Sequence, residues 1–314
     1  MSRASLFQAM GLLLLAAVSW GGMFQVAKPL LPQIDAFHMT AIRYGGAAFL
    51  FAGLLAYREG RGAFRLEGRG MLLWLYGSLG FAGFNLLAFT GLAHSRPEHA
   101  AVIMALMPLM TALVNWGMRG IRPASHTLVA IAIALTGVVL VVSNGHLSAL
   151  SASGQVGGDL LLLLGALCWV FYTLGAARFT HWSPLRYTTL TCLLGALSIF
   201  AATAAMTRLG HIHPPTMAAV QDGLWALAYM VVIGAVIAVL SWNAGIRQLG
   251  ALNGVLFINF VPVSAFVIGV ILGHRFGLAE LAGAAFVILA LIFNSLLSQR
   301  ASARMAVNAV AMAR

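Results

Sequence analysis

Long apolar runs separated by short polar or charged breaks dominate this chain. Ten such runs can be read, and each is close to the ~20 helical residues that cross the hydrocarbon core of a bilayer. No segment alternates apolar and polar residues with the period of a strand, so a transmembrane barrel is disfavoured. The pattern predicts an all-α integral membrane protein with ten transmembrane helices, near 6–27, 37–57, 71–93, 99–118, 127–144, 157–179, 187–208, 224–246, 252–272 and 279–297.

The composition leaves no room for a separate soluble domain. Of 314 residues, 61% are hydrophobic and 8% are charged, and the mean hydropathy is +0.95. A soluble domain carries about 25% charged residues. The formal charge of +11 would suggest nucleic acid only if the basic residues formed one soluble patch. They lie between the apolar runs, so we expect the lipid bilayer, and no nucleic acid, as a partner.

Basic residues are divided unequally between the two sets of connections that ten spans create. The set that includes both ends of the chain holds 13 Lys and Arg residues, and the opposite set holds 4. Cytoplasmic loops carry the excess of basic residues in membrane proteins. We therefore predict a multi-pass protein of a bacterial-type cytoplasmic (inner) membrane, with both termini in the cytoplasm.

The chain contains a weak internal repeat. A shift of 149 residues places Trp20 on Trp169, and a shift of 154 residues places Pro108 on Pro262. Five spans is an odd number, so the second copy enters the membrane from the opposite side. Inverted repeats typically place a substrate site near the midplane between the halves. The sequence thus predicts two inverted five-helix repeats, 1–148 and 149–298, and a short cytoplasmic C-terminal tail, 299–314; duplication retained for packing is the alternative.

Several short patterns follow one another along the chain: Trp20-Gly21-Gly22, Arg43-Tyr44 followed by small residues, and the runs around Pro108 and Pro262. In this order they resemble the EamA-type transporters of the drug/metabolite transporter superfamily. The resemblance covers residues 6–298 and implies a secondary-type carrier that works by alternating access and exports small organic metabolites, mostly amino acids. Within the family, the chain looks most like the YddG-like exporters of aromatic amino acids.

Aromatic side chains inside the runs are the strongest candidates for a substrate site. Trp and Tyr usually collect at membrane interfaces, and rings away from them can stack on an apolar body or hold an ammonium group. Asn85 is added because a neutral amide near mid-span suits a zwitterion. Helix packing and interhelical hydrogen bonding are the alternatives. The candidate substrate-binding residues are Trp20, Phe24, Phe81, Asn85, Met104, Trp169, Tyr172, Trp242 and Phe257.

Four further residues are assigned structural roles. Arg43 lies inside a span, where a charge needs partners, so it is predicted to anchor helix-end carbonyls; a contact to a substrate carboxylate is the alternative. Lys28 is predicted to be an interface anchor. Pro108 and Pro262 each remove a backbone hydrogen bond inside an apolar run and are candidate hinges, with passive kinks as the alternative.

Charged residues give little sign of catalysis or proton coupling. The carboxylates, among them Glu98 and Asp159, fall at span ends or in connections, which favours facilitated or exchange transport over strict proton antiport. No acid/base pair, nucleophile with its base or metal-binding spacing is found. We expect no catalytic residue, no metal, no cofactor and no enzymatic activity. A flippase, or a carrier for another metabolite, drug or lipid, is the first alternative and an integral membrane enzyme a weaker one; the sequence leaves the oligomeric state open.

Overall fold

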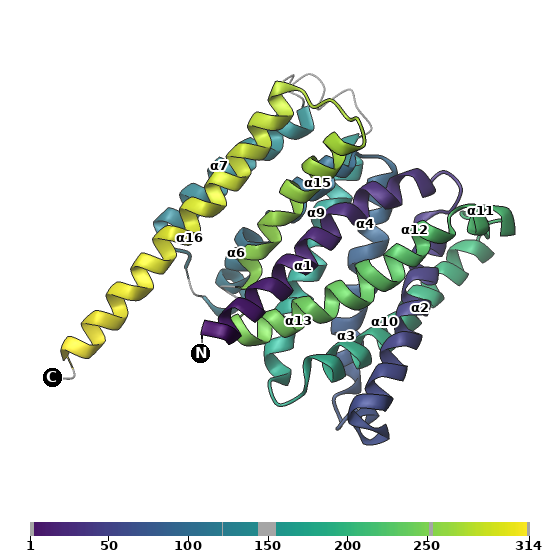
Figure 1. The fold of residues 1–314 in the computed structure, drawn as a ribbon, viewed down its shortest axis with the longest axis horizontal. Helices are drawn as coiled ribbons and strands as arrows, with labels where there is room; N and C mark the ends of the chain where they lie inside the picture. The colour runs from purple at the N-terminus through teal and green to yellow at the C-terminus, as the bar shows by residue number, and fades with distance from the viewer. Residues whose placement is uncertain (1–2, 121, 144–154, 251–253, 313–314) are drawn as a thin grey trace. The chain divides into compact units, whose positions relative to one another are not determined.

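The structure is a computed structural model that describes residues 3–120, 122–143, 155–250 and 254–312 (Figure 1). Within these ranges all regular secondary structure is helical. The chain divides into a larger unit, Met1–Met107 with Ser153–Arg275, and a smaller one, Pro108–Ala152 with Phe276–Arg314. The predicted repeat boundary at 148/149 and residues 252–253 of the predicted ninth span lie outside the described residues.

Apolar helices account for each predicted span, though not all at full length. In the described ranges, six helices are long and apolar enough to cross a membrane, or seven if the broken pair Pro97–Met104 and Met107–Met118 forms one span. The other three predicted spans match shorter apolar helices, Ser125–Val141, Phe257–Ile271 and Leu278–Asn294. An all-helical, polytopic membrane protein is confirmed for the described chain, and the number ten stays a prediction. The six are Ser5–Leu30, Ala36–Glu59, Gly70–Ala93, Val156–Phe179, Pro184–Arg208 and Leu224–Leu249.

The larger unit is a bundle in which helices from both predicted repeats contact one another. Helix α1 packs on α13 and α15, α9 packs on α4 and α5, and α2 packs on α10 (Figure 1). The elements of this unit are α1 (Arg3–Ala27), η1 (Lys28–Leu30), α2 (Ala36–Glu59), η2 (Arg61–Phe64), α3 (Gly70–Gly77), η3 (Ser78–Gly83), α4 (Phe84–Ala93), α5 (Pro97–Met104), α9 (Gln155–Ala176), η4 (Ala177–Phe179), α10 (Pro184–Arg208), α11 (Met217–Asp222), α12 (Leu224–Ala228), η5 (Tyr229–Ile237), α13 (Ala238–Leu249), η6 (Val255–Asn259) and α15 (Phe260–Ile271).

Two long spans each contain a π-helical segment in the middle. Segment η3 lies between α3 and α4, and η5 lies between α12 and α13. The shift of 154 residues that aligns the predicted repeats places Ser78–Gly83 inside Tyr229–Ile237. The two π-helical segments therefore occupy corresponding positions of the predicted repeat. Such segments are rare and often occur at functional sites.

The two candidate hinge prolines lie just after breaks in their helices. A turn at Ala105 and Leu106 interrupts the helix, and α6 (Met107–Arg119) begins directly after it. Pro108 is the second residue of α6. Pro262 is the third residue of α15, after the 3₁₀ segment η6. The first backbone N–H groups of a helix have no acceptor within it, so proline is tolerated there. These prolines therefore do not remove a hydrogen bond from the interior of a continuous helix, which is what the sequence had suggested.

The smaller unit contains α6 from Pro108 onward, α7 (Ser125–Ser143) and α16 (Leu278–Met312). Helices α7 and α16 run along each other (Figure 1). Their close approach depends on glycine, because a Cβ atom on Gly137 would lie 2.6 Å from the carbonyl oxygen of Gly283. The Thr127 hydroxyl also donates to Asn294 Oδ1 at 2.8 Å. Helix α16 continues through residues 299–312 of the predicted tail.

A similar glycine contact between α4 and α9 gives a test of the packing. A Cβ atom on Gly91 would lie 2.4 Å from the Gly158 carbonyl oxygen, whereas one on Gly53 would meet nothing within 4 Å. We expect Gly91→Ala to lower the free energy of unfolding by about 1–3 kcal/mol. Gly53→Ala, the matched control in a helix, should be neutral or slightly stabilising. Thermal unfolding of both variants in detergent measures the difference, and equal midpoints would contradict this packing.

Candidate functional site

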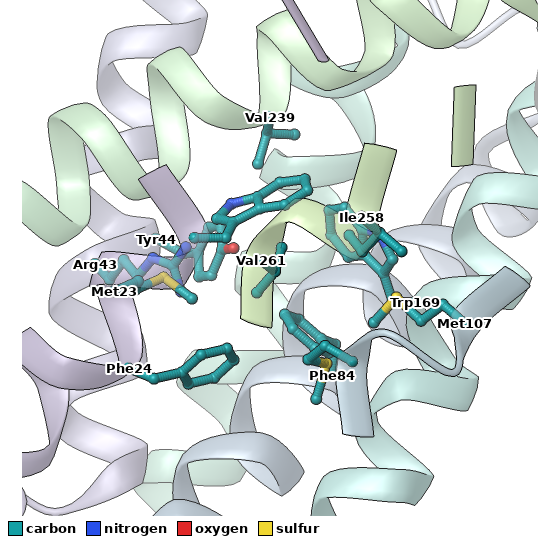
Figure 2. Close-up of a pocket in the computed structure, with 12 residues that line it drawn as sticks. Met23, Phe24, Arg43, Tyr44, Phe84, Met107, Trp169, Val239, Ile258 and Val261 are labelled. Atoms are coloured by element: carbon teal, nitrogen blue, oxygen red, sulfur yellow. The ribbon is translucent and has the colours of Figure 1, made fainter. Parts of the chain in front are cut away.

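The larger unit contains a small pocket lined almost entirely by apolar side chains, which we call the ring pocket (Figure 2). Its free volume is about 20 Å³, room for roughly one water molecule. Figure 2 shows Phe24, Phe84 and Val261 converging on the same space. The lining residues are Trp20, Met23 and Phe24 from α1, Arg43 and Tyr44 from α2, Phe84 from α4, Met104 from α5, Met107, Trp169 from α9, Val239 from α13, Ile258 from η6 and Val261 from α15.

Rings from both predicted repeats meet at this pocket. Trp20 of α1 and Trp169 of α9 lie 5.5 Å apart between ring centroids, with ring planes at 83°. Trp242 lies 5.3 Å from Trp20, and Tyr172 lies 5.0 Å from Trp169. Phe81 in turn lies 5.2 Å from Tyr172. These edge-on and tilted geometries are the ones aromatic pairs prefer, so five predicted residues form one continuous cluster.

Arg43 is the charged residue of the pocket, and it is 1% exposed. Its Nε donates to the Met230 carbonyl at 3.1 Å, and its Nη2 donates to the Gly234 carbonyl at 2.9 Å. Both carbonyls belong to the π-helical segment η5, not to a helix end as the sequence suggested. Trp20 Nε1 donates to the same Gly234 oxygen at 3.0 Å. The guanidinium and the indole of Trp20 thus join α1 and α2 to the middle of η5.

No carboxylate among the described residues forms an ion pair with Arg43. Its Nη1 donates to Asn85 Oδ1 at 2.7 Å, and the rings of Tyr44 and Phe89 lie 4.9 and 5.7 Å from its Cζ atom. Neutral dipoles and π faces therefore surround a buried cation. A buried charge with neutral partners leaves a positive potential in the pocket, which favours an anionic group there.

Four of the nine candidate substrate-binding residues line the ring pocket, and the others lie behind or beside it. Asn85 donates through Nδ2 to Tyr44 Oη at 3.2 Å and to the Phe81 carbonyl at 2.9 Å, so its amide is fully engaged with protein. Phe257 packs on Phe260 with a centroid distance of 6.0 Å, while its neighbour Ile258 reaches the pocket. The lining candidates are Trp20, Phe24, Met104 and Trp169.

Sequence reasoning missed several lining residues. Tyr44 directly follows Arg43 and could have been found from the same two-residue pattern. Met23 and Met107 line the pocket too, and flexible thioethers suit a site that must adapt to a ligand. Apolar residues of this kind carry no sequence signal that separates a cavity wall from ordinary core.

Polar side chains join the helices near the N-terminal end of α9. Glu98, 1% exposed, accepts from Gln25 Nε2 at 2.9 Å, and His274 Nδ1 lies 3.3 Å from the same carboxylate oxygen. Asp159 accepts a short hydrogen bond from the Ser95 hydroxyl. These carboxylates do lie near helix ends, but the structure buries them, which their positions in the sequence did not indicate.

Lys28 belongs to the same polar end of the larger unit. Its Nζ donates to the carbonyls of Leu92, Ala93 and Ser95 at 2.6, 3.0 and 2.7 Å. The last carbonyls of a helix lack partners within it and carry partial negative charge. Lys28 therefore holds the C-terminal end of α4 against the end of α1.

Apolar helices of spanning length around an internal, ring-lined pocket define a polytopic helical membrane protein. The EamA-like transporter family matches residues 8–143 and again 156–296. This chain belongs to the EamA-like transporter family, and it is a membrane transporter.

Curated relatives agree with this assignment. The "Uncharacterized transporter YrdR" of Bacillus subtilis (strain 168) is 36% identical over 304 residues, which cover 96% of this chain and 95% of that protein. The "Uncharacterized inner membrane transporter YedA" of Escherichia coli (strain K12) is 26% identical over 272 residues, or 84% and 82% of the two chains. A crystal structure superimposes with a TM-score of 0.69 over 95% of this chain and 99% of that one. At 21% identity, this likeness shows the fold alone.

Proposed function

We propose that this transporter is a secondary carrier that exports small organic metabolites, chiefly amino acids including aromatic ones, by alternating access through the ring pocket. The single observation that carries the proposal is the meeting of Trp20 and Trp169, one ring from each repeat, at a pocket beside a buried cation. Inverted-repeat carriers hold their substrate between the repeats. We further propose that the chain belongs with the YddG-like exporters of aromatic amino acids.

The packing of the larger unit supports two inverted repeats within 1–148 and 149–298, and hence ten spans. The repeat makes α9 the counterpart of α1, α13 of α4, and η6 of α5. Helix α1 contacts α13 and η6, and α9 contacts α4 and α5, so each of these contacts has its exchanged counterpart. Likewise α2 contacts η5, and α10 contacts η3. Exchanged contacts of this kind are what a pseudo-two-fold axis in the membrane plane produces.

The chemistry of the ring pocket favours a solute with an apolar body and a carboxylate. Trp20, Phe24, Phe84 and Trp169 offer ring faces to the body. A guanidinium has five N–H donors, and Arg43 uses three of its nitrogens on protein acceptors, so donors remain for a carboxylate. With about 20 Å³ free, the pocket must open before such a solute can bind. Movement at the helix breaks before Pro108 and Pro262 is our proposal for how it opens.

The charge asymmetry of the loops supports cytoplasmic termini in an inner membrane. In that orientation, the polar cluster around Glu98 and Gln25 closes the outer end of the larger unit. The other end of α9 then faces the cytoplasm. Closure at one end is the arrangement that a carrier needs to expose its site to one side at a time.

Uptake into proteoliposomes with labelled L-phenylalanine tests the proposal. We expect saturable uptake that unlabelled aromatic and large apolar amino acids reduce by competition. Organic cations without a carboxylate should compete poorly. If no amino acid competes and short-chain phospholipids do, the substrate class is wrong and a flippase takes its place. Flux that rises without saturation would make the protein a channel.

A further inference from the structure

A second cavity, which we call the vestibule, lies where α9, α10 and α13 come together at the end of the larger unit away from Glu98 and Asp159. Its free volume is about 360 Å³, within the usual range for small-molecule sites, about 300–1,000 Å³. It begins some 14 residues along α9 from Asp159, or about 21 Å of helix. The lining residues used below are Thr173, Phe179, Trp182, Tyr187, Asn243 and Arg247.

Arg247 is the charged side chain among the described residues that line the vestibule. Its Nη1 donates to the Trp182 carbonyl, which leaves other guanidinium donors for a ligand. The carboxylates of Glu67 and Glu59 lie behind the wall and do not line the vestibule. Glu67 accepts from Arg186 Nη2 at 2.6 Å, and Glu59 accepts from the hydroxyl of Ser183. The lining therefore presents a positive charge with no opposing carboxylate in the wall.

The Glu67 contact also fixes the wall of the vestibule. Hydrogen bonds from Arg186 and from Trp182 Nε1 lower the pKa of the Glu67 carboxyl, so the carboxylate is ionised at neutral pH. Arg186 lies with its Cζ atom 4.0 Å over the Trp182 ring. Trp182 is thereby held rigidly beside Phe179, at a centroid distance of 5.0 Å. The wall is a fixed apolar surface, which suits the apolar body of a solute.

Two polar groups deeper in the vestibule lack full partners. The Thr173 hydroxyl is buried and has no hydrogen-bond partner within the described part of the chain. Asn243 donates through Nδ2 to Tyr172 Oη at 3.0 Å and to Thr188 Oγ1 at 2.6 Å, so its Oδ1 remains an acceptor. Burying an unsatisfied hydroxyl destabilises a fold unless something else satisfies it. A ligand with an ammonium group would meet the Asn243 Oδ1 acceptor here, and it would reach the Thr173 hydroxyl once that side chain turns toward the cavity.

One ring lies between the vestibule and the ring pocket. Tyr172 stacks on Tyr187 of the vestibule at 5.4 Å and 23°, and it lies 5.0 Å from Trp169 of the ring pocket. Tyr172 also holds the Asn243 amide. Tyr172 therefore contacts a lining residue of each cavity, Tyr187 of the vestibule and Trp169 of the ring pocket.

We propose that the vestibule is a binding site for a small carboxylate-bearing solute with an apolar body, in which Arg247 binds the carboxylate. Phe179, Trp182 and Tyr187 contact the apolar body, and Thr173 and Asn243 accept hydrogen bonds from an ammonium group where the solute has one. The proposal rests on the transport function above, because the occupant is the cargo before it enters the ring pocket.

Equilibrium binding to the purified full chain in detergent tests the site separately from transport. The probes are labelled L-phenylalanine, hydrocinnamate, which lacks the amine, and phenethylamine, which lacks the carboxylate. We expect the first two to bind and phenethylamine to bind at least about 10-fold more weakly. Arg247→Gln should weaken binding of both carboxylates about 10-fold or more, one charge-assisted contact being of this size. Arg247→Lys should restore part of it.

Two further variants separate a ligand site from a structural contact. Arg178→Gln removes an exposed cation of the neighbouring segment η4 that does not line the vestibule, and it should leave binding unchanged. Thr173→Val should raise the thermal midpoint of the unliganded protein, because it removes an unsatisfied hydroxyl. It should also weaken L-phenylalanine more than hydrocinnamate.

The outcomes distinguish this site from the carrier function. Equal loss in Arg247→Gln and Arg178→Gln, or equal binding of phenethylamine and L-phenylalanine, would overturn the vestibule site. Saturable flux together with no effect of Arg247→Gln would also overturn it while the carrier function stands. Binding that depends on Arg247, with no flux of any probe in proteoliposomes, would support the site and remove the carrier function.

Discussion

Trp169→Ala is expected to reduce the transport efficiency for L-phenylalanine by about 10- to 100-fold. Trp169 contacts Trp20, Phe84 and Tyr172, with centroid distances of 5.5, 5.2 and 5.0 Å, and is 4% exposed. Truncating a buried Trp to Ala typically costs 3–5 kcal/mol, and each ~1.4 kcal/mol is tenfold in binding. Part of the loss falls on the fold and part on substrate contact. Initial rates over a range of concentrations measure the result.

Variants that keep an aromatic ring separate the loss of substrate contact from the loss of fold stability. Trp169→Phe should retain most transport, since its role is ring contact. Trp20→Phe should be damaged more, because it also loses the hydrogen bond from Nε1 to Gly234. Trp225→Ala is the matched control, because Trp225 is 87% exposed on α12. Unchanged flux in Trp169→Ala, with correct folding shown by size-exclusion chromatography, would remove this ring from the substrate site.

Arg43→Met is expected to lower the free energy of unfolding by about 2–4 kcal/mol. The change leaves Asn85 Oδ1 without its guanidinium donor. It also removes the hydrogen bonds from Arg43 to the carbonyls of Met230 and Gly234. Each lost charge-assisted hydrogen bond is worth about 1.5–3 kcal/mol, and relief of the buried charge offsets part of the sum. The measurement is denaturant-induced unfolding in detergent.

A double-mutant cycle isolates the contact between Arg43 and Asn85. In Asn85→Leu, the guanidinium loses a neutral acceptor, and the double variant should be less destabilised than the two single changes predict. Coupling of about 0.5–2 kcal/mol is expected, in line with polar contacts in membrane bundles. Arg208→Met, at the exposed end of α10, is the control and should have little effect. Strict additivity in the cycle would mean that the two side chains do not stabilise each other.

The helices could be predicted from the sequence because hydropathy is a local property. The apolar runs at 37–57 and 187–208 contain few charges and end at Arg or Glu, and they correspond to α2 and α10. The prolines Pro108 and Pro262 indicated the region of each helix break, but the sequence did not predict that each break lies before its proline. The π-helical segments carry no residue pattern, so η3 and η5 could not be predicted.

The site was predictable where one residue type has few other reasons to be buried. Trp20 and Trp169 were found in this way, and the structure brings them together. Asn85 was selected on the same reasoning, but a neighbouring guanidinium and a Tyr hydroxyl use its amide. Burial of Glu98 depends on Gln25 and His274, which lie 73 and 176 residues away along the chain. Contacts over such separations are set by tertiary packing and leave no local signal.

Counterflow is the most direct test of a carrier with a ring pocket between inverted repeats. Proteoliposomes loaded with unlabelled L-phenylalanine are diluted into a trace of the labelled amino acid. We expect transient accumulation of label above its equilibrium level, because each return of the occupied site carries label inward. The overshoot should be absent in Trp169→Ala. Label that enters no faster into loaded than into empty vesicles would contradict an alternating-access carrier for this substrate.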